Sequence, residues 1–287
     1  MIYVALSVIC SVLVSIVLKL ARRFGVELTQ AIAWNYAVAS GLTALLLQPA
    51  LPHWRAAGTP WLALLGLGLL LPTVFLALAA SVRHAGIVRS DAAQRLSLLL
   101  SLLAAFALFG ERLDAGKGAG IALGVLALAC LLWRDGRGAA GSDRSVAAWR
   151  YPLAVFGGFA AIDILFKYVA LAGLALAASL QVMFALALLV ALLPPLWQRL
   201  HGGVRFGGRS ALAGALLGLA NFGNILFYLR AHRALPQHPA LVFAGMNLGV
   251  VALGALVGTL GFGERLSRRN LAGVALALLA IVLISRG

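Results

Sequence analysis

The chain has 287 residues, of which 63% are apolar and 11% are charged, and its formal net charge is +15. A water-soluble domain carries about 25% charged residues, so this composition excludes a soluble protein and predicts an integral membrane protein. The basic excess does not indicate nucleic-acid binding, because the Lys and Arg residues fall mostly between apolar runs, where topology selection places them.

A helix that crosses the bilayer needs about 20 apolar residues. The sequence predicts ten such helices, in chain order, at about 2–21, 28–49, 60–82, 86–110, 116–133, 151–171, 174–197, 210–229, 238–261 and 268–285. The longest polar connection, 134–150, divides them five and five.

The two halves share a motif. Phe-Gly-Glu-Arg-Leu occurs at 109–113 and again at 262–266, 153 residues later, each time before an apolar run. Lys19 likewise matches Lys167, and Gln94 matches Asn247. These matches predict a duplication, with repeats at 1–133 and 151–287 joined by 134–150. Because five spans are an odd number, the second copy must insert upside down. The predicted fold is an all-α integral membrane protein with ten transmembrane helices in two inverted five-helix repeats.

Positive charge predicts the orientation. Connections after odd-numbered runs hold 14 Lys and Arg residues, and the opposite side holds 6. The positive-inside rule then places both termini on the periplasmic side of a bacterial inner membrane.

Two features carry a resemblance to a known family: the Gly-Glu-Arg-Leu motifs at 110–113 and 263–266, and the lysines Lys19 and Lys167. In these features the chain resembles the EamA-type transporters of the drug/metabolite transporter superfamily. The resemblance implies secondary transport of small metabolites, often export, through a central cavity lined by spans 1, 3, 4, 6, 8 and 9. It also implies cytoplasmic termini, against the charge count. The chain departs from many members in its fourth span, where it reads Ser-Asp-Ala-Ala-Gln-Arg at 90–95.

Ionisable side chains inside spans cost about 2.5–3.5 kcal/mol each and indicate a polar cavity. Asp163 and Lys167 lie four residues apart on one helix face, as do Asp91 and Arg95. Arg95 and the lysines could meet a carboxylate or phosphate, and Asp163 or Asp91 an amine or a proton. The alternative is that each pair neutralises itself, or that Lys19 and Lys167 reach the nearer interface.

Uncharged polar residues extend the candidate site, although such groups often only join helices. The predicted substrate-binding residues are Arg95, Asp91, Gln94, Asn221, Asn224, Tyr228, Asn247, Lys19 and Lys167, and the predicted proton-coupling residue is Asp163. Packing is favoured for Gln30 and Gln181, and a structural role for Glu111 and Glu264. The small-residue spacings Gly214/Gly218, Gly245/Gly249 and Gly254/Gly258 predict close helix contacts.

The leading hypothesis is a transporter, with export favoured, for amino-acid-like or other zwitterionic or anionic metabolites. A flippase for a lipid-linked head group is the alternative. A membrane enzyme or a structural subunit is a third hypothesis, but the sequence shows no nucleophile motif and no metal-ligand spacing, so neither an enzyme nor a cofactor is expected. The expected partners are a small molecule and the lipid bilayer, and a homodimer stays open.

Overall fold

The computed structural model describes residues 2–21, 23–50, 58–97, 99–100, 103, 115–132, 147–201, 206–235, 239–264 and 266–286. Every regular element in these ranges is a helix. The elements are α1 (Ile2–Ala21), α2 (Leu28–Leu47), α3 (Trp61–Ala85), α4 (Ile87–Leu96), α6 (Ala115–Leu132), α7 (Ala147–Leu171), α8 (Leu176–Leu200), α9 (Gly208–Ala234), α10 (Pro239–Leu256), the π-helical turn η1 (Val257–Gly261) and α11 (Arg268–Arg286).

Six of the described helices are long and apolar enough to cross a membrane: α1, α2, α3, α7, α8 and α9. Shorter apolar stretches lie at Gly118–Ala127 in α6 and at Gly245–Gly261 in α10 and η1. Because helices satisfy their backbone hydrogen bonds internally, apolar helices are the form in which such segments enter lipid. The protein is an all-α, multi-pass membrane protein, as the composition predicts.

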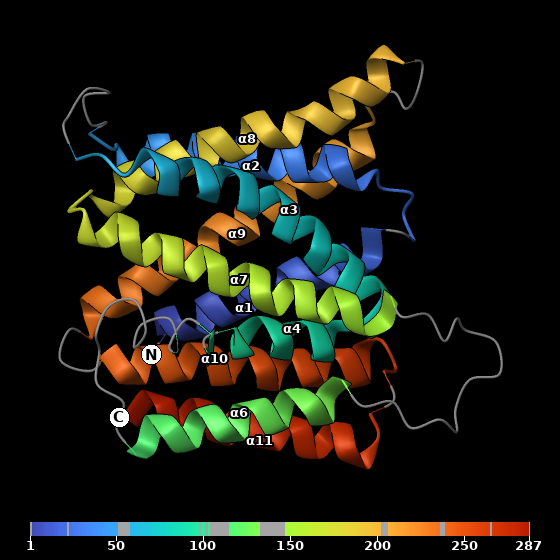
Figure 1. The fold of residues 1–287 in the computed structure, drawn as a ribbon. Coiled ribbons are helices and arrows are strands. Elements are labelled where there is room, and N and C mark those ends of the chain that lie inside the picture. The colour runs from blue at the N-terminus through green and yellow to red at the C-terminus, as the bar shows by residue number, and fades with distance from the viewer. Residues whose placement is uncertain are drawn as a thin grey trace.

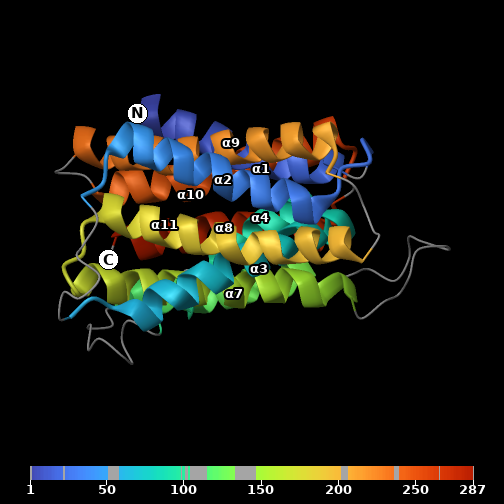
Figure 2. The same ribbon diagram turned by 90° about the horizontal axis from the view of Figure 1, so that it is seen from above.

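The helices lie side by side along a common axis (Figures 1 and 2). In Figure 1, α2 and α8 form one margin of the bundle and α6 and α11 form the other, with the remaining helices between them. Both chain ends lie at the same end of the bundle in the two views. This placement agrees with termini on one side of a membrane.

Close contacts at glycines give the directions of neighbouring helices. Gly245 and Gly249 of α10 meet Val4 and Val8 of α1, so these helices run parallel. The same spacing on α9 places Gly214 and Gly218 against α2. The predicted role of these small residues in close packing is confirmed.

The α3 and α7 helices run antiparallel. Gly66 of α3 meets Leu165 of α7, whereas Gly158 of α7 meets Val74, further along α3. Since α1 and α3 end together, where Lys19 donates to the Val82 carbonyl oxygen at 3.4 Å, α1 and α7 point in opposite directions (Figure 1).

Helices from the first half of the chain pack mainly on helices from the second half. The α1 helix packs on α9 and α10, and α7 packs on α3 and α4. The α2 helix packs on α9, and α8 packs on α3. The α2 helix also packs on α8 at one margin of the bundle, and α6 packs on α11 at the other (Figure 1). Between the margins, α4 packs on α10.

The described helices start and end within a few residues of the predicted runs, with two differences. The α7 helix begins at Ala147, so Trp149 and Arg150 belong to a helix and not to the predicted connection. In the predicted run 86–110, the described residues are helical over Ile87–Leu96 and again at 99–100 and 103. Glu111, Arg265, the first Gly-Glu-Arg-Leu motif and most of the connection 134–150 lie outside the described residues.

Candidate functional site

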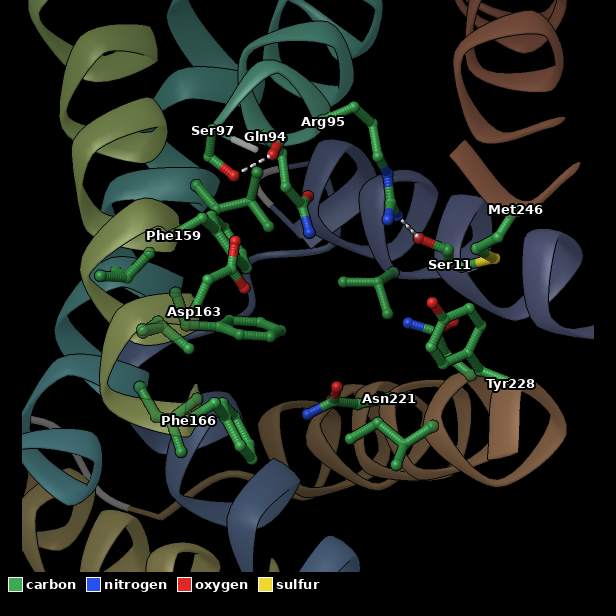
Figure 3. Close-up of a pocket in the computed structure, with 18 of the residues that line it drawn as sticks. Ser11, Gln94, Arg95, Ser97, Phe159, Asp163, Phe166, Asn221, Tyr228 and Met246 are labelled. Carbon is green, nitrogen blue, oxygen red and sulfur yellow. Dashed lines mark hydrogen bonds between the residues drawn. The ribbon is translucent and has the colours of Figure 1, made fainter. Parts of the chain in front are cut away.

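A cavity of about 510 Å³ lies among α1, α3, α4, α7, α8, α9 and α10 (Figure 3). Its polar lining comes from Ser11, Ser15, Gln94, Arg95, Ser97, Asp163, Asn221, Asn224, Tyr228 and Asn247. Its apolar lining includes Phe75, Phe159, Phe166, Phe184, Leu78, Ile162, Leu180 and Met183. A concave, mostly apolar space with a few convergent polar groups is the usual form of a small-molecule site.

Opposite charges face each other across this cavity. Figure 3 shows Arg95 of α4 and Asp163 of α7 on different walls, both directed toward the open space. The Nη2 atom of Arg95 donates to Ser11 Oγ at 2.7 Å, while its Nε atom is buried and makes no hydrogen bond within the described chain. The Arg95 charge interacts electrostatically with Asp163 and Tyr228. The guanidinium is therefore held in place from one side and still has donor capacity for a ligand.

The α9 helix supplies a wall of amides. Asn221, Asn224 and Tyr228 share one face of the helix, and all three line the cavity. Asn221 Nδ2 is 3.4 Å from Asn35 Oδ1, and Asn224 accepts from Ser7 Oγ at 2.8 Å through Oδ1 and at 2.9 Å through its carbonyl oxygen. These bonds join α9 to neighbouring helices and orient the two amides, which is the helix-joining role that uncharged polar residues often have. The same residues also face the cavity.

The wall opposite α9 is apolar and aromatic. Phe159, Ile162, Asp163 and Phe166 lie on one face of α7, and α3 and α8 add Phe75 and Phe184. Sequence reasoning missed these aromatic residues because a Phe in an apolar run looks like any other apolar residue. Their spacing around Asp163 was the available signal, since positions three and four residues apart share a helix face.

Seven of the ten predicted site residues line the cavity: Gln94, Arg95, Asp163, Asn221, Asn224, Tyr228 and Asn247. Asp91 and Lys19 are not among the lining residues. Lys167 is part of α7, but its side chain lies outside the described ones. The predicted pairing of Asp163 with Lys167 is therefore not tested.

Asp91 and Arg95 do not form an ion pair in the described structure. Asp91 is 2% exposed, and its Oδ1 atom accepts from Ser15 Oγ at 2.7 Å. Arg95 instead donates to Ser11. Both side chains turn to α1, which runs antiparallel to α4, although the two charges still act on each other.

The partners of Asp91 and Arg95 belong to a continuous row on α1, which we name the α1 polar stripe: Ser7, Ser11, Ser15 and Lys19. Each member is four residues from the next and bonds to a different residue. The partners, in order, are Asn224, Arg95, Asp91 and Glu264. The stripe joins α1 to α9, to α4 and to the segment after η1.

At the end of the stripe, Lys19 Nζ is 3.1 Å from Glu264 Oε1. The same carboxylate accepts from the backbone N–H groups of Ile87 at 2.8 Å and Val88 at 3.3 Å, and so caps the start of α4. A carboxylate at a helix N-terminus satisfies unpaired donors and complements the helix dipole. We name this group the Lys19–Glu264 cluster. It supports the predicted structural role of Glu264.

Gly86 makes room for the cluster. Its φ of +91° is in a region that L side chains rarely adopt, and a Cβ atom there would lie 2.5 Å from Glu264 Oε2. Glycine alone fits both the turn from α3 into α4 and the approach of the carboxylate.

A Haemophilus influenzae protein, described as an uncharacterized protein, is 42% identical to this chain over 285 residues, which cover 96% of this chain and 94% of the relative. The chain belongs to the family of that protein. No family model matches it. A protein of known crystal structure is similar in fold, with a TM-score of 0.54 and 17% sequence identity over 96% of this chain and 95% of its own. These comparisons show similarity over nearly the whole length of the chain. The function has to be inferred from the site itself.

Proposed function

We propose that the protein is a secondary transporter that carries small zwitterionic metabolites by alternating access. The observation that carries this proposal is the cavity, in which a guanidinium and a carboxylate face each other beside an aromatic wall. A free amino acid matches these features: its carboxylate would meet Arg95, its amine would meet Asp163, and an apolar side chain would lie against the phenylalanines.

The proposal includes ten spans in two inverted repeats, and the positions that line the cavity support it. On α3 the lining residues are Leu71, Val74, Phe75 and Leu78, and on α9 they are Asn221, Asn224, Ile225 and Tyr228. Each member of the second set follows its counterpart by 150 residues. On α1 and α7, the three residues Ser11, Val14 and Ser15 match Phe159, Ile162 and Asp163 at a spacing of 148. Gln94 matches Asn247 at 153.

The helix packing gives independent support to the repeat. If α1 corresponds to α7 and α3 to α9, then the α1–α9 contact is equivalent to the α7–α3 contact, and both occur. The opposite directions of α1 and α7 are those expected of an inverted copy. Inverted repeats with a site at their interface are typical of carriers that expose the site alternately to the two sides.

The resemblance to EamA-type transporters supports the same function, and export remains the favoured direction. We also propose the bacterial inner membrane as the location, with the termini in the periplasm as the positive charges indicate. Asp163, Arg95, Gln94, Asn221, Asn224, Tyr228 and Asn247 are the proposed substrate contacts. Asp91 and Lys19 are weaker candidates for substrate contact, because the cavity lining does not include them. Lys167, whose side chain lies outside the described ones, stays a proposed contact.

Binding and flux test the proposal together. The purified protein is screened by thermal denaturation against phenylalanine, leucine, glutamate and lysine, and against soluble phospholipid analogues. A ligand at 100 times its dissociation constant stabilises a protein by about 2.7 kcal/mol. Stabilisation by the apolar zwitterions, with uptake of the same radiolabelled compounds into proteoliposomes, is the expected result. Stabilisation by the phospholipid analogues alone would favour the flippase, and indifference to both sets would overturn the carrier.

A further inference from the structure

We propose that Asp91 is a proton-binding site, separate from the substrate contacts, and that its protonation controls the charge that Arg95 offers to the substrate. Proton binding follows from the surroundings of Asp91 alone, whereas its role in coupling rests on the proposed transport function. The sequence analysis predicts Asp163 as the proton-coupling residue, so variants of Asp91 and of Asp163 distinguish the two assignments.

The two oxygens of Asp91 have unequal surroundings. Oδ1 accepts from Ser15, while Oδ2 is buried and has no hydrogen-bond partner in the described structure. Oδ2 lies against the backbone of α10 at Gly254, where an added Cβ atom would be only 2.5 Å away. A buried carboxylate that is neither paired with a cation nor fully hydrogen-bonded pays a large desolvation penalty, and a proton removes that penalty.

The charged groups around Asp91 can be named element by element. Arg89 and Arg95 lie on its own helix, and Arg89 donates to Asn270 of α11 at 3.0 Å. Glu264, which is bound to Lys19 of α1, adds a like charge from the segment after η1. The α10 helix carries no charged residue. The Lys, Arg, His, Asp and Glu residues on the other helices packed against α4 are Arg83 and His84 of α3, Lys117 of α6, Arg150, Asp163 and Lys167 of α7, and Arg268, Arg269 and Arg286 of α11. Of these, Arg83, His84, Arg268 and Arg269 are exposed, and Asp163 acts on Arg95.

Ser15 connects this site to the cavity. Its hydroxyl donates to Asp91 and its residue also lines the cavity, so Asp91 lies one side chain behind the surface that a substrate would touch. A hydroxyl can donate and accept at the same time. Ser15 can therefore pass a proton from cavity water to Asp91, and back again once the cavity faces the other side.

Arg95 links the proton to the substrate. Asp91 and Asp163 both act electrostatically on the Arg95 guanidinium. When Asp91 takes a proton, Arg95 loses one counter-charge and attracts a carboxylate in the cavity more strongly. By linkage, a bound carboxylate then favours the protonated form of Asp91 to the same extent. Proton and substrate would thus bind and leave together, so an inward proton gradient would drive uptake and not the export that the family resemblance favours.

Infrared titration of the full-length protein tests proton binding without any substrate. Protonated carboxyl groups have a C=O stretching band that disappears on ionisation. We expect a titrating band that is lost in Asp91→Asn and kept in Asp163→Asn. Ser15→Ala removes the donor to the Asp91 carboxylate, so it should move the midpoint of that band to higher pH and serves as a second variant if Asp91→Asn fails to fold. Identical titrations of the carboxyl bands in the wild type and in Asp91→Asn would overturn the proposal.

Coupling is then tested with the amino acid that stabilises the wild-type protein in the thermal screen. Binding to the wild type should tighten as the pH falls, and a proton gradient should raise uptake by up to about tenfold per pH unit, since one unit is a tenfold ratio of proton concentration. In Asp91→Asn, binding should stay tight at every pH and uptake should ignore the gradient. An unchanged pH dependence in Asp91→Asn would overturn the coupling role. If no amino acid binds, the proposed function fails, while the infrared result still decides on Asp91.

Discussion

In the proposed repeat, the α1 polar stripe and the cavity face of α7 occupy matching positions, yet their side chains have different surroundings. Ser7, Ser11, Ser15 and Lys19 of the stripe each bond to a named partner on another part of the chain. On α7, the residues that follow Ser11 and Ser15 by 148 positions are Phe159 and Asp163, which face the cavity. One helix uses its polar groups to hold neighbours together, and the other presents a charge beside aromatic rings to open space.

The difference shows what polar spacing in a span can and cannot indicate. Polar residues four apart mark one face of a helix in both cases. Whether that face packs or binds depends on the residues opposite it, which come from distant parts of the sequence. Changes at the packed contacts of the stripe should therefore mainly alter stability, whereas changes on the cavity face of α7 should mainly alter binding.

The largest effect on stability is expected at the end of the stripe. Glu264→Ala removes the partner of Lys19 and the cap of α4, and loss of one member of a largely buried ion pair costs about 3 kcal/mol. The two side chains are 25% and 13% exposed, so the value belongs at the lower end of the range for such pairs. Reversible unfolding of the protein in mixed detergent micelles measures the change.

The double variant Lys19→Met with Glu264→Gln is the control for this prediction. If the pair is a structural joint, the double variant should unfold with a smaller loss than the sum of the two single changes, since each single change leaves a charge without its partner. Additive losses would mean that Lys19 and Glu264 act separately.

The next largest effect is expected at Gly254 of α10, where an added Cβ atom would meet Asp91 Oδ2 at 2.5 Å. Overpacking at a tight contact costs about 1–3 kcal/mol, so Gly254→Ala should lower the free energy of unfolding by that amount. Gly157 of α7 is the matched control, because nothing lies within 4 Å of the added atom there. Gly157→Ala should be neutral or stabilise the helix by up to about 1 kcal/mol. Equal effects of the two changes would contradict the close approach of α4 and α10.

Local sequence was sufficient to locate the helices and much of the cavity lining. Apolar length fixed α1 at Ile2–Ala21, and ionisable or amide residues inside apolar runs pointed to Arg95, Asp163 and Asn221. The reason is energetic: a polar group in lipid needs either a partner or a water-filled space.

The sequence could not distinguish a polar residue that bonds to another helix from one that faces the cavity. Lys19 and Asp91 are ionisable residues inside apolar runs, as are Arg95 and Asp163. However, Lys19 pairs with the Glu264 carboxylate, and Asp91 accepts a hydrogen bond from the Ser15 hydroxyl. The aromatic wall was missed for the opposite reason, since Phe75 and Phe184 look like any apolar residue until α3 and α8 are placed beside α7. Both kinds of information are carried by long-range packing.

On the α7 side, Asp163→Asn should leave stability nearly unchanged and weaken the binding of an amino acid. Loss of the carboxylate that faces the amine should raise the dissociation constant about tenfold, which corresponds to about 1.4 kcal/mol. Titration of the stabilising amino acid by thermal denaturation measures it. Asp163→Glu keeps the charge and should retain more of the affinity. If both variants bind like the wild type, Asp163 does not contact the substrate.

The smallest expected effect lies at the start of the stripe. Ser7 donates to Asn224 on α9, and hydrogen bonds between membrane helices average about 0.6 kcal/mol, so Ser7→Ala should lower the free energy of unfolding by roughly that amount. Thr73 of α3 provides the control, because its hydroxyl bonds to the carbonyl oxygens of Leu69 and Leu70 in its own helix. Thr73→Ala removes a hydroxyl without separating any pair of helices, and it should be neutral or slightly stabilising, since Ala has the higher helix propensity. Because Asn224 also lines the cavity, Ser7→Ala should in addition loosen the amide that faces the substrate. A small loss of affinity with Ser7→Ala and none with Thr73→Ala would show that the packed stripe on α1 also orients the binding wall on α9.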